Sequence, residues 1–201
     1  IVTFIFSIGV ALAMVSAFLI CGAGQAINDI FDYKIDKKIN KKKPIPSGKV
    51  SRSNATIFSA ILFLVGIILA FFINPLAFTI AVIFSILLIL YASVLYKVKY
   101  LGNIVVALGT AFTFIFGASV TETIPLLIII FAMSAFFANM SREITKDFED
   151  LKKDKGFKKT LPMISKKLAK SFAVSYHLLA ILFAMLAFAF FLSNNIAYFI
   201  M

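Results

Sequence analysis

Two groups of three aspartates recur in the sequence with the same spacing. In each group the second aspartate follows the first by three residues, and the third follows the first by seven residues. The six residues are Asp29, Asp32, Asp36, Asp147, Asp150 and Asp154. Residues with these separations share one face of a helix, so each group predicts an acidic stripe about two turns long. Carboxylates on one stripe repel each other unless a cation binds them.

The chemistry of these side chains predicts a metal site built from oxygen ligands. Neither His nor Cys lies near the aspartates. Mg²⁺ favours oxygen ligands and commonly binds one or two carboxylates together with the phosphates of a substrate. No EF-hand pattern supports Ca²⁺ storage. We therefore expect Mg²⁺ as the cofactor and a phosphate-bearing substrate.

The sequence around the two groups also repeats. Residues 28–37 align with residues 146–155, and a proline, Pro44 or Pro162, follows the first aspartate of each group by fifteen residues. Ser47 and Ser165 follow the two prolines at equal distances. This pattern predicts an internal duplication, which could bring the two acidic stripes to face each other across a bundle axis.

Long apolar stretches must position these groups. The chain has 201 residues, of which 62% are hydrophobic and 14% charged, and this composition excludes a soluble domain. A spanning helix needs about 20 mostly apolar residues. We predict an all-α, polytopic membrane helix bundle of about seven spans or part-spans. The expected spans are 1–27, 55–73, 76–95, 103–120, 124–141 and 172–193, with a stub from 196.

The distribution of charge predicts how these spans are oriented. The 20 Lys and Arg residues all lie in segments 28–54, 96–100 and 142–170, and the alternate connections contain none. The positive-inside rule makes the basic side cytoplasmic. We therefore expect an integral protein of the cell membrane with its active site facing the cytoplasm. The net charge of +11 is then explained by topology, and no nucleic-acid partner is expected.

The position of the acidic groups indicates the kind of substrate. They lie where apolar spans meet the membrane face, and the chain contains 24 Phe residues, some of which could line a channel for a lipid tail. We expect a diphosphate that carries such a tail. The chain starts and stops inside apolar runs, so residues 1–201 are expected to be a single transmembrane domain truncated at both ends.

The two motifs resemble the signatures of the UbiA superfamily of intramembrane prenyltransferases. Asn28 and the first aspartate group resemble the first signature, and the second group resembles the second. Residues 40–49 resemble the loop after the first signature, with Lys43 where an Arg is common. A third and less strictly defined region of the family resembles the part of this sequence that contains Tyr91, Tyr96, Lys97 and Asn103. The resemblance implies one bundle of about nine spanning helices in the full-length protein.

The resemblance also implies roles for individual residues. It implies that the catalytic residues are Asp29, Asp32, Asp147, Asp150 and Lys97. It implies that all six aspartates bind the metal. The residues implied to contact substrate are Asn28, Lys43, Lys49, Tyr91, Tyr96, Asn103, Asn139, Arg142 and Lys146. If the acceptor is a lipid phosphate, its head group would need a second basic patch drawn from Lys49, Arg52, Lys158 or Lys159.

Residues 139–150 are most similar to archaeal members of the superfamily that act on lipids. Those enzymes attach a geranylgeranyl group to the free hydroxyl of geranylgeranylglyceryl phosphate and form the second ether bond of archaeal lipids. The expected function is this Mg²⁺-dependent transfer, with a prenyl diphosphate donor, a lipid or aromatic acceptor and membrane lipids as partners. An aromatic quinone precursor as the acceptor is one alternative, and a non-catalytic transporter is another. His177, the single histidine, is expected to be structural.

Overall fold

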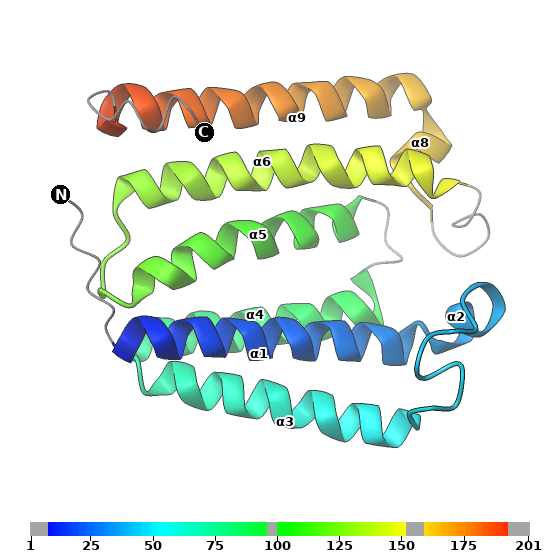
Figure 1. Cartoon of the computed structure of the whole chain (residues 1–201). Helices are drawn as coiled ribbons and strands as arrows, with labels where there is room; N and C mark the ends of the chain where they lie inside the picture. Colours follow the sequence, from blue (N-terminus) through cyan, green and yellow to red (C-terminus); the bar gives the residue numbers. More distant parts are fainter. Residues whose placement is uncertain (1–7, 96–99, 152–158, 193–201) are drawn as a thin grey trace. The chain divides into compact units, whose positions relative to one another are not determined.

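The computed structural model describes residues 8–95, 100–151 and 159–192. Six of its helices are long and apolar enough to cross a membrane, and the predicted all-α membrane bundle is confirmed. The helices are α1 (Ile8–Phe31), α2 (Tyr33–Ile39), α3 (Arg52–Phe71), α4 (Pro75–Ser93), α5 (Leu101–Ser119), α6 (Leu126–Glu149), α8 (Leu161–Ile164) and α9 (Lys166–Ala187), which continues as a π-helical turn at Phe188–Leu192 (Figure 1). The expected stub from 196 lies outside the described residues.

The helix ends differ from the predicted spans at the charged face. The fifth span was predicted to end at residue 141, but α6 continues to Glu149. The sixth was predicted to begin at residue 172, but α9 begins at Lys166, where Ser165 accepts a hydrogen bond from the Leu168 N–H. Charged side chains leave the apolar layer without ending a helix, because Lys, Glu and Arg are good helix formers. The spanning helices therefore carry the acidic motifs outward.

The chain forms two compact units. The first unit contains α1, α2, α3 and α4, and its three long helices pack against one another. The Ser16 hydroxyl donates to the Gly66 carbonyl at 2.7 Å, and the Ser59 hydroxyl donates to the Ala23 carbonyl at 3.0 Å. Small residues and such interhelical hydrogen bonds are typical of helix packing in membranes. These bonds hold α1 beside α3.

The second unit contains α5, α6, α8 and α9. Here α6 packs along α9. The Ser134 hydroxyl donates to the Ala180 carbonyl at 2.9 Å, and the Ser141 hydroxyl donates to the Ala173 carbonyl at 2.8 Å. Serine-to-carbonyl hydrogen bonds therefore join α6 to α9, as they join α1 to α3.

Polar side chains attach α5 to the rest of the second unit. The Asn139 amide on α6 donates to the Val106 carbonyl at 3.3 Å and to the Thr110 hydroxyl. At the start of α5, the Tyr100 hydroxyl is hydrogen-bonded to the Tyr176 hydroxyl of α9. These bonds fix the end of α5 that lies near the second acidic motif.

The serine–carbonyl bonds of the two units fall at corresponding positions in the sequence. Ser16 and Ser134 lie 118 residues apart, as do Asp29 and Asp147. Each serine donates from the motif-bearing helix to the helix that packs beside it. The predicted duplication therefore extends from the acidic motifs into the packing of the spans.

The offset between corresponding residues of the two units changes from 118 to 114 after the segment that connects the motif-bearing helix to the next spanning helix. Ser51 caps α3 and Ser165 caps α9, each accepting from a backbone N–H three residues later, and the two serines lie 114 residues apart. The predicted pairing of Ser47 with Ser165 is thus wrong, because the Ser47 hydroxyl donates instead to the Pro44 carbonyl at 3.1 Å. The connection in the first unit is four residues longer.

With this shift, the second pair of bonds also corresponds. Ser141 lies 118 positions after Ala23, and Ala173 lies 114 positions after Ser59. The bond between the two helices is present in both units, but its donor has moved from α3 in the first unit to α6 in the second. The matching contacts support an internal duplication.

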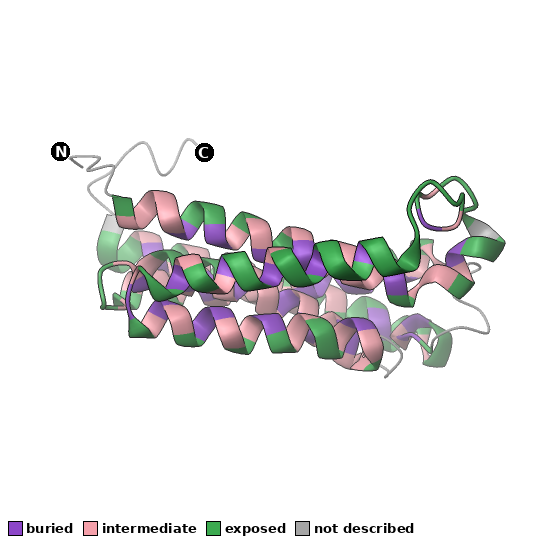
Figure 2. Ribbon diagram, turned by 90° about the horizontal axis from the view of Figure 1, so that it is seen from below, coloured by how far each residue is buried: buried purple, intermediate pink, exposed green. Residues whose placement is uncertain are grey.

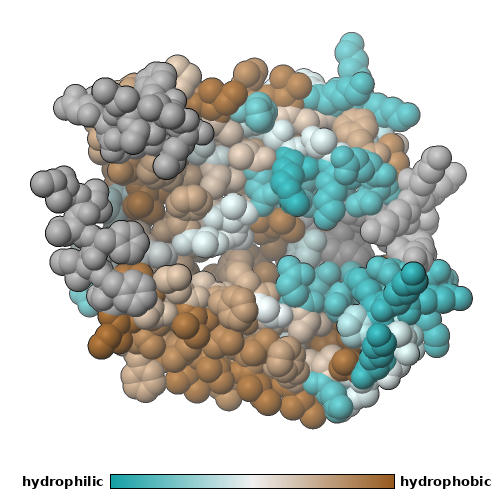
Figure 3. Space-filling model, in the orientation of Figure 1, coloured by the Kyte–Doolittle hydropathy of each residue, from teal (hydrophilic) through white to brown (hydrophobic). Residues whose placement is uncertain are grey.

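Apolar surface covers the spans of each unit. Large hydrophobic residues such as Phe18, Ile57, Leu64 and Val174 are mostly exposed, and exposed and buried residues alternate along each long helix (Figure 2). Hydrophilic side chains gather at the α2 end of the first unit and at the α8 end of the second (Figure 3). This distribution is that of an integral membrane protein whose helices face lipid.

Candidate active site

The first acidic group lies where α1 passes into α2. Asp29 is in the last turn of α1, Asp32 is the residue between the helices, and Asp36 is on α2. The predicted stripe on one continuous helix is wrong at this point, because the regular helix is interrupted at Asp32 and α2 turns away from the axis of α1 (Figure 1). The backbone N–H of Asp32 still donates to the Asn28 carbonyl, and that of Asp36 donates to the Asp32 carbonyl, both at 2.9 Å. The three aspartates therefore keep near-helical spacing.

A lysine side chain bridges two of these carboxylates. Lys43 Nζ lies 2.8 Å from Asp29 Oδ1 and 2.8 Å from Asp36 Oδ2. The Asp36 side chain is buried, whereas Asp29 is partly exposed. Two carboxylates around one cation form a hydrogen-bonded cluster at the end of a membrane span. The cluster can accept positive charge from a lysine or from a metal ion.

The electrostatics of Lys43 follow from this geometry. Burial lowers the pKa of the Lys43 ammonium, but the hydrogen bonds and negative charges of Asp29 and Asp36 outweigh burial. The pKa of Lys43 therefore lies above its ordinary value, and the side chain is charged at neutral pH.

The loop that carries Lys43 is anchored by an apolar contact. Ile45 is buried in a small cluster with Ile30 of α1 and Ala55 of α3. The Ser47 N–H donates to the Lys43 carbonyl at 2.9 Å. A loop residue buried between two spanning helices fixes the loop close to the aspartates. Lys43 is thus placed by packing as well as by charge.

The second acidic group begins in the last turn of α6. Asp147 is buried, with 5% of its surface exposed. Its Oδ2 accepts a hydrogen bond of 2.9 Å from the Asn103 amide of α5. A buried carboxylate needs such a donor, because an unsatisfied charge inside a protein is costly. The structure thus brings together Asp147 and Asn103, two residues expected at the site from different sequence regions.

The rest of the second group marks the end of α6. Asp150 is the C-cap residue, and its N–H donates to the Lys146 carbonyl at 3.0 Å. Asp154 lies outside the described residues, as do Tyr96, Lys97 and Lys158. On the same helix, Glu143 is buried and forms an ion pair of 2.7 Å with the exposed Arg142.

The remaining expected residues lie in varied surroundings. The Asn28 amide donates to Asp32 Oδ2 at 3.3 Å. Lys49 and Lys159 are exposed, and Tyr91 is half-buried on α4. Arg52 lies over the Tyr33 ring, 5.3 Å from its centre. The Asn139 amide holds α5 against α6, which is a packing role that the sequence did not predict.

The aspartates provide the right donors for Mg²⁺ but not a complete cage. Among residues 8–95, 100–151 and 159–192, no three His, Cys, Asp or Glu side chains are grouped closely enough to hold a metal ion. Lys43 Nζ shows that Asp29 and Asp36 can converge on one cation. Mg²⁺ usually keeps several waters and takes substrate phosphates as ligands. The residues therefore fit Mg²⁺ that arrives together with a phosphate-bearing substrate.

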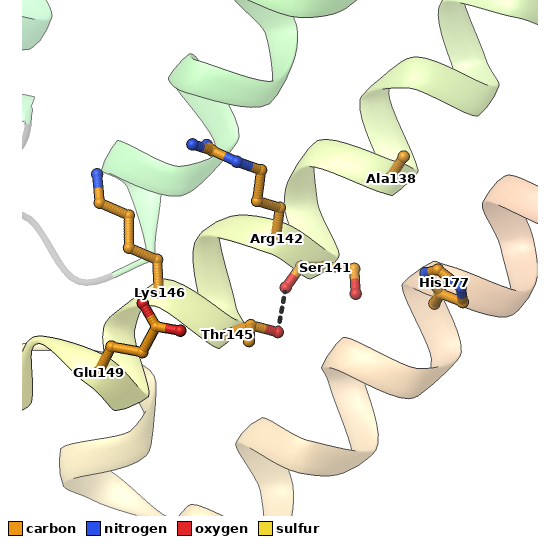
Figure 4. A pocket seen from close by; sticks show the side chains of 7 residues that line it. All are labelled: Ala138, Ser141, Arg142, Thr145, Lys146, Glu149 and His177. Atoms are coloured by element: carbon orange, nitrogen blue, oxygen red, sulfur yellow. Dashed lines mark hydrogen bonds between the residues drawn. The ribbon is translucent and has the colours of Figure 1, made fainter.

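A hollow of about 590 Å³ opens between α6 and α9 in the second unit. We call this cavity the α6–α9 hollow. Its lining residues are Ala138, Ser141, Arg142, Thr145, Lys146, Glu149 and His177. Figure 4 shows Arg142 and Lys146 extending from α6 while His177 stands on α9.

Most of this lining was not predicted from the sequence. Arg142 and Lys146 were expected to contact substrate, whereas His177 was expected to be structural and Thr145 was not considered. The signal was present in the sequence: Ala138, Arg142, Thr145 and Glu149 recur at spacings of four, three and four, which places them on one helix face. A polar face at the end of an apolar span indicates a surface other than lipid.

The family model of the UbiA prenyltransferase family matches residues 3–201. Digeranylgeranylglyceryl phosphate synthase from Methanococcus aeolicus is 46% identical over 146 residues, which cover 73% of this chain and 52% of the relative. The enzyme of the same name from Methanosarcina mazei is 42% identical over 175 residues, covering 85% of this chain and 60% of the relative. The chain spans about half of the length of the first of these curated relatives.

Solved structures share the fold. One, described for digeranylgeranylglyceryl phosphate synthase in membranes, superposes with a TM-score of 0.82 at 34% identity and covers 94% of this chain and 68% of its own. A UbiA homologue from Archaeoglobus fulgidus bound to DMAPP and Mg²⁺ superposes with a TM-score of 0.79 at 19% identity, covering 91% of this chain and 67% of its own.

Proposed function

Because the chain belongs to the UbiA prenyltransferase family, we propose that its protein transfers a prenyl group from a prenyl diphosphate to a membrane-bound acceptor. The observation that carries this proposal is the Lys43 cation between Asp29 and Asp36 at the end of a membrane span. The cluster offers oxygen ligands at the depth where the diphosphate of a lipid-tailed donor would lie. The matching motif around Asp147 supplies a second set of carboxylates.

The aspartates of both motifs are proposed to hold Mg²⁺ at the donor's diphosphate. Asp29, Asp32, Asp147 and Asp150 would be direct ligands, and Asp36 and Asp154 would complete or orient the shell. When bound, Mg²⁺ neutralises the negative charge that develops on the leaving diphosphate. The A. fulgidus homologue was solved with Mg²⁺ and DMAPP, which supports the same cofactor and donor class here.

The chain's own residues prepare this site. Asn103 holds the Asp147 carboxylate in one orientation, and Asn28 does the same for Asp32. The Lys43 ammonium would move from the carboxylates toward a phosphate oxygen when the metal and the donor bind. Lys97 is proposed to neutralise the same diphosphate, with Tyr91 and Tyr96 beside the donor. Apolar walls would then keep water from an allylic cation.

We propose geranylgeranyl diphosphate as the donor and the free hydroxyl of geranylgeranylglyceryl phosphate as the acceptor. The product would contain the second ether bond of an archaeal lipid. The names of the relatives from M. aeolicus and M. mazei support this choice. An aromatic quinone precursor is the competing acceptor.

Domain organisation and location follow from the spans and their charges. Residues 1–201 are proposed to form a single transmembrane prenyltransferase domain that is part of a longer chain. Of the 20 basic residues, 18 lie in segments 28–54 and 142–170, which carry the two motifs, and the other two lie in segment 96–100 on the same side of the predicted spans. We therefore place the active site at the cytoplasmic face of the cell membrane.

The decisive experiment measures diphosphate release by the full-length protein in detergent or lipid. We expect release from geranylgeranyl diphosphate to require Mg²⁺ and geranylgeranylglyceryl phosphate and to yield a diether product. The Asp29→Asn and Asp147→Asn variants should each lose nearly all activity. Glu122→Gln is the matched control, because Glu122 is an exposed acid outside both motifs.

Three outcomes would contradict parts of this proposal. Release with an aromatic acceptor alone would replace the lipid acceptor by the quinone-type one. Full activity in both aspartate variants would refute the metal site. Absence of diphosphate release with every acceptor, together with substrate movement across vesicles, would favour a transporter.

A further inference from the structure

The proposed reaction releases a proton that the metal site is not suited to take. Ether formation from an alcohol breaks the O–H bond of the acceptor as well as the C1–O bond of the donor. The aspartates of both motifs are assigned to Mg²⁺, and a carboxylate that holds a metal ion is a poor base, because the ion disfavours its protonated form. The base for this proton must therefore be a different side chain.

Glu143 is a buried acid outside both motifs. Among the residues that the structure describes, three acids are buried, namely Asp36, Glu143 and Asp147. Asp36 and Asp147 belong to the motifs, whereas Glu143 lies within the spanning helix α6. Burial of a carboxylate is costly, and ionisable residues inside membrane spans usually have a function. Glu143 is therefore the acid whose burial metal binding does not explain.

Glu143 shares a helix face with Asp147. It precedes Asp147 by four residues, which corresponds to about 400° of rotation and leaves the two side chains about 40° apart around the axis of α6. The α6–α9 hollow is on the other side of the helix, since its Ala138 lies nine residues before Asp147, or about 180° away from it. Glu143 therefore points toward the side of α6 that carries the acidic motif.

The depth of Glu143 matches that of the reacting carbon of the donor. Each helical residue adds about 1.5 Å, so Glu143 lies about 6 Å nearer than Asp147 to the apolar part of α6. In the proposed function, the diphosphate is bound at Asp147 and the prenyl tail extends into the apolar layer. C1 is the first carbon after the diphosphate, so it would lie just inward of Asp147 on the same face. The Glu143 side chain keeps 11% of its surface exposed, which leaves a narrow approach for a hydroxyl.

An arginine orients the Glu143 carboxylate. Arg142 Nη1 donates to Glu143 Oε1 at 2.7 Å. The guanidinium supplies the countercharge that a buried carboxylate needs. This bond engages Oε1 and leaves Oε2 as the atom that would take a proton.

Helix α5 lies along this face without adding charge. Asn139 and Asp147, one turn before and one turn after Glu143, are each hydrogen-bonded to α5. Between Leu101 and Ser119, α5 contains no charged or titratable side chain. No group on α5 therefore competes with Glu143 for a proton.

The first half of the chain carries the neutral form of this side chain. By the spacing of 118 residues, the counterpart of Glu143 is Gln25. Glutamine has nearly the shape of glutamate without its negative charge, and α1 is a regular helix around Gln25. The helix itself therefore does not require a charge at this position, and Glu143→Gln is a conservative test.

We propose that Glu143 is the general base that takes the proton of the acceptor hydroxyl. The inference rests on the proposed function, because it assigns a residue to that reaction. The C1–O bond of the donor breaks and its electron pair leaves with the diphosphate, while a lone pair of the hydroxyl oxygen forms the new bond to C1. The proton of this oxygen passes to Glu143 Oε2 and from there to water. The oxygen becomes positively charged as the bond forms, so a carboxylate paired with Arg142 is basic enough to take the proton.

The experiment compares the full-length parent with Glu143→Gln in detergent under single-turnover conditions, with geranylgeranyl diphosphate, Mg²⁺ and geranylgeranylglyceryl phosphate. We expect diether formation to fall by about 10²–10⁴-fold, the usual contribution of a general base. Equilibrium binding of donor and acceptor, measured by thermophoresis, should stay within about threefold of the parent. Glu149→Gln is the matched control, because Glu149 is an exposed acid of the same helix that lines the α6–α9 hollow (Figure 4), and it should keep the parent rate.

An acceptor with a thiol in place of the hydroxyl separates proton transfer from positioning. A thiol loses its proton far more readily than an alcohol, with a pKa of about 8.5 for the side chain of Cys, so its attack does not need a base. The thiol acceptor should react in Glu143→Gln within about tenfold of the parent rate. Glu143→Asp keeps a carboxylate but withdraws it by one methylene group, so its rate of diether formation should be intermediate.

Three results would overturn the proposal. They are parent-like diether formation in Glu143→Gln, a loss of substrate binding large enough to explain the lost rate, and an equal loss of rate with the thiol acceptor. Failure of the proposed function has a different signature, because the parent itself would then form no diether. A parent that forms the diether and a Glu143→Gln variant that matches it would leave the proposed function intact and remove only the base.

Discussion

Lys43 makes the clearest prediction at the scale of single residues. The Lys43→Met variant keeps the length of the side chain but leaves Asp29 and Asp36 facing each other without a countercharge. We expect the unfolding free energy in chelator to fall by about 1–2 kcal/mol. Mg²⁺ should restore more stability in the variant than in the parent, because both carboxylates become available to the metal. Thermal unfolding with and without Mg²⁺ measures both effects.

The pH dependence supplies an independent check on Lys43. Its pKa is raised in the folded protein, so its stabilising contribution is fully present below the ordinary value of 10.5 and is lost as the pH rises through the folded value. The stability difference between the parent and Lys43→Met should therefore vanish in strong alkali. Lys34→Met, an exposed lysine on α2, is the control, and an equal effect of this change would contradict the bridging role.

A second prediction concerns the support of Asp147. Asn103→Leu keeps a similar side-chain volume but removes the amide that donates to the buried carboxylate. We expect a loss of about 1–3 kcal/mol in unfolding free energy and a fall of about 10–100-fold in apparent Mg²⁺ affinity, as for other groups that orient a metal ligand. The Mg²⁺ concentration needed for half-maximal diphosphate release measures the second effect. An unchanged value would show that Asn103 does not orient the ligand.

Single residues were predicted unevenly from the sequence. The acids were found because their type and spacing carry the signal, and their predicted metal-binding roles stay predictions. The ion pairs of Lys43 depend on where a loop of a dozen residues folds back, which is decided by burial of Ile45 and cannot be read from local spacing. His177 and Arg142 line the α6–α9 hollow together, but they are far apart in the sequence, so local spacing could not group them; the structural role expected of His177 stays a prediction.

At the scale of elements, α1 and α3 pack closely at Gly66. A Cβ on Gly66 would lie 2.7 Å from Ile20 Cγ1 and 3.2 Å from the Ser16 carbonyl oxygen. Gly66→Ala should therefore separate the helices and cost about 1–3 kcal/mol. In the second unit the corresponding residues are Ala180 and Ala138, so a small partner accommodates the extra methyl group.

The pair of alanines at these positions in the second unit suggests a double-mutant test in the first unit. Adding Ile20→Ala should recover much of the stability lost by Gly66→Ala, giving a favourable coupling energy. Gly117→Ala is the control, because a Cβ there meets nothing within 4 Å and Ala is the better helix former. Additive losses in the double variant would contradict the packing relation. Denaturation in mixed micelles measures all four proteins.

Elements were predicted well in number and less well at their ends. The six described spans were found from apolar length, which is the dominant constraint in a bilayer. The ends of α6 and α9 were missed because hydropathy falls at the first charge, whereas backbone hydrogen bonding continues through Arg142 to Glu149. The interruption at Asp32 was also missed, since nothing in the residue types around it forbids a helix.

At the scale of the whole molecule, topology is the property to test. In a Cys21→Ala background, which removes the single cysteine, we expect a Lys49→Cys variant to react with a membrane-impermeant maleimide only in inverted vesicles. A Glu122→Cys variant should react only in right-side-out vesicles. The reason is the placement of every basic residue on one side of the predicted spans. Labelling of both variants from the same side would refute the orientation.

The bonds Ser59–Ala23 and Ser141–Ala173 join corresponding positions but have their donor serines on opposite helices, which bears on the origin of the two halves. Between Ala23 and Ser59 the hydroxyl comes from α3, and between Ser141 and Ala173 it comes from α6. If both halves descend from one ancestral segment, the bond outlasted the residue that makes it, since either helix can supply the hydroxyl to the other's carbonyl. Comparing the halves residue by residue would score two mismatches at this place. Comparing pairs of positions would instead recognise the shared bond between the two helices.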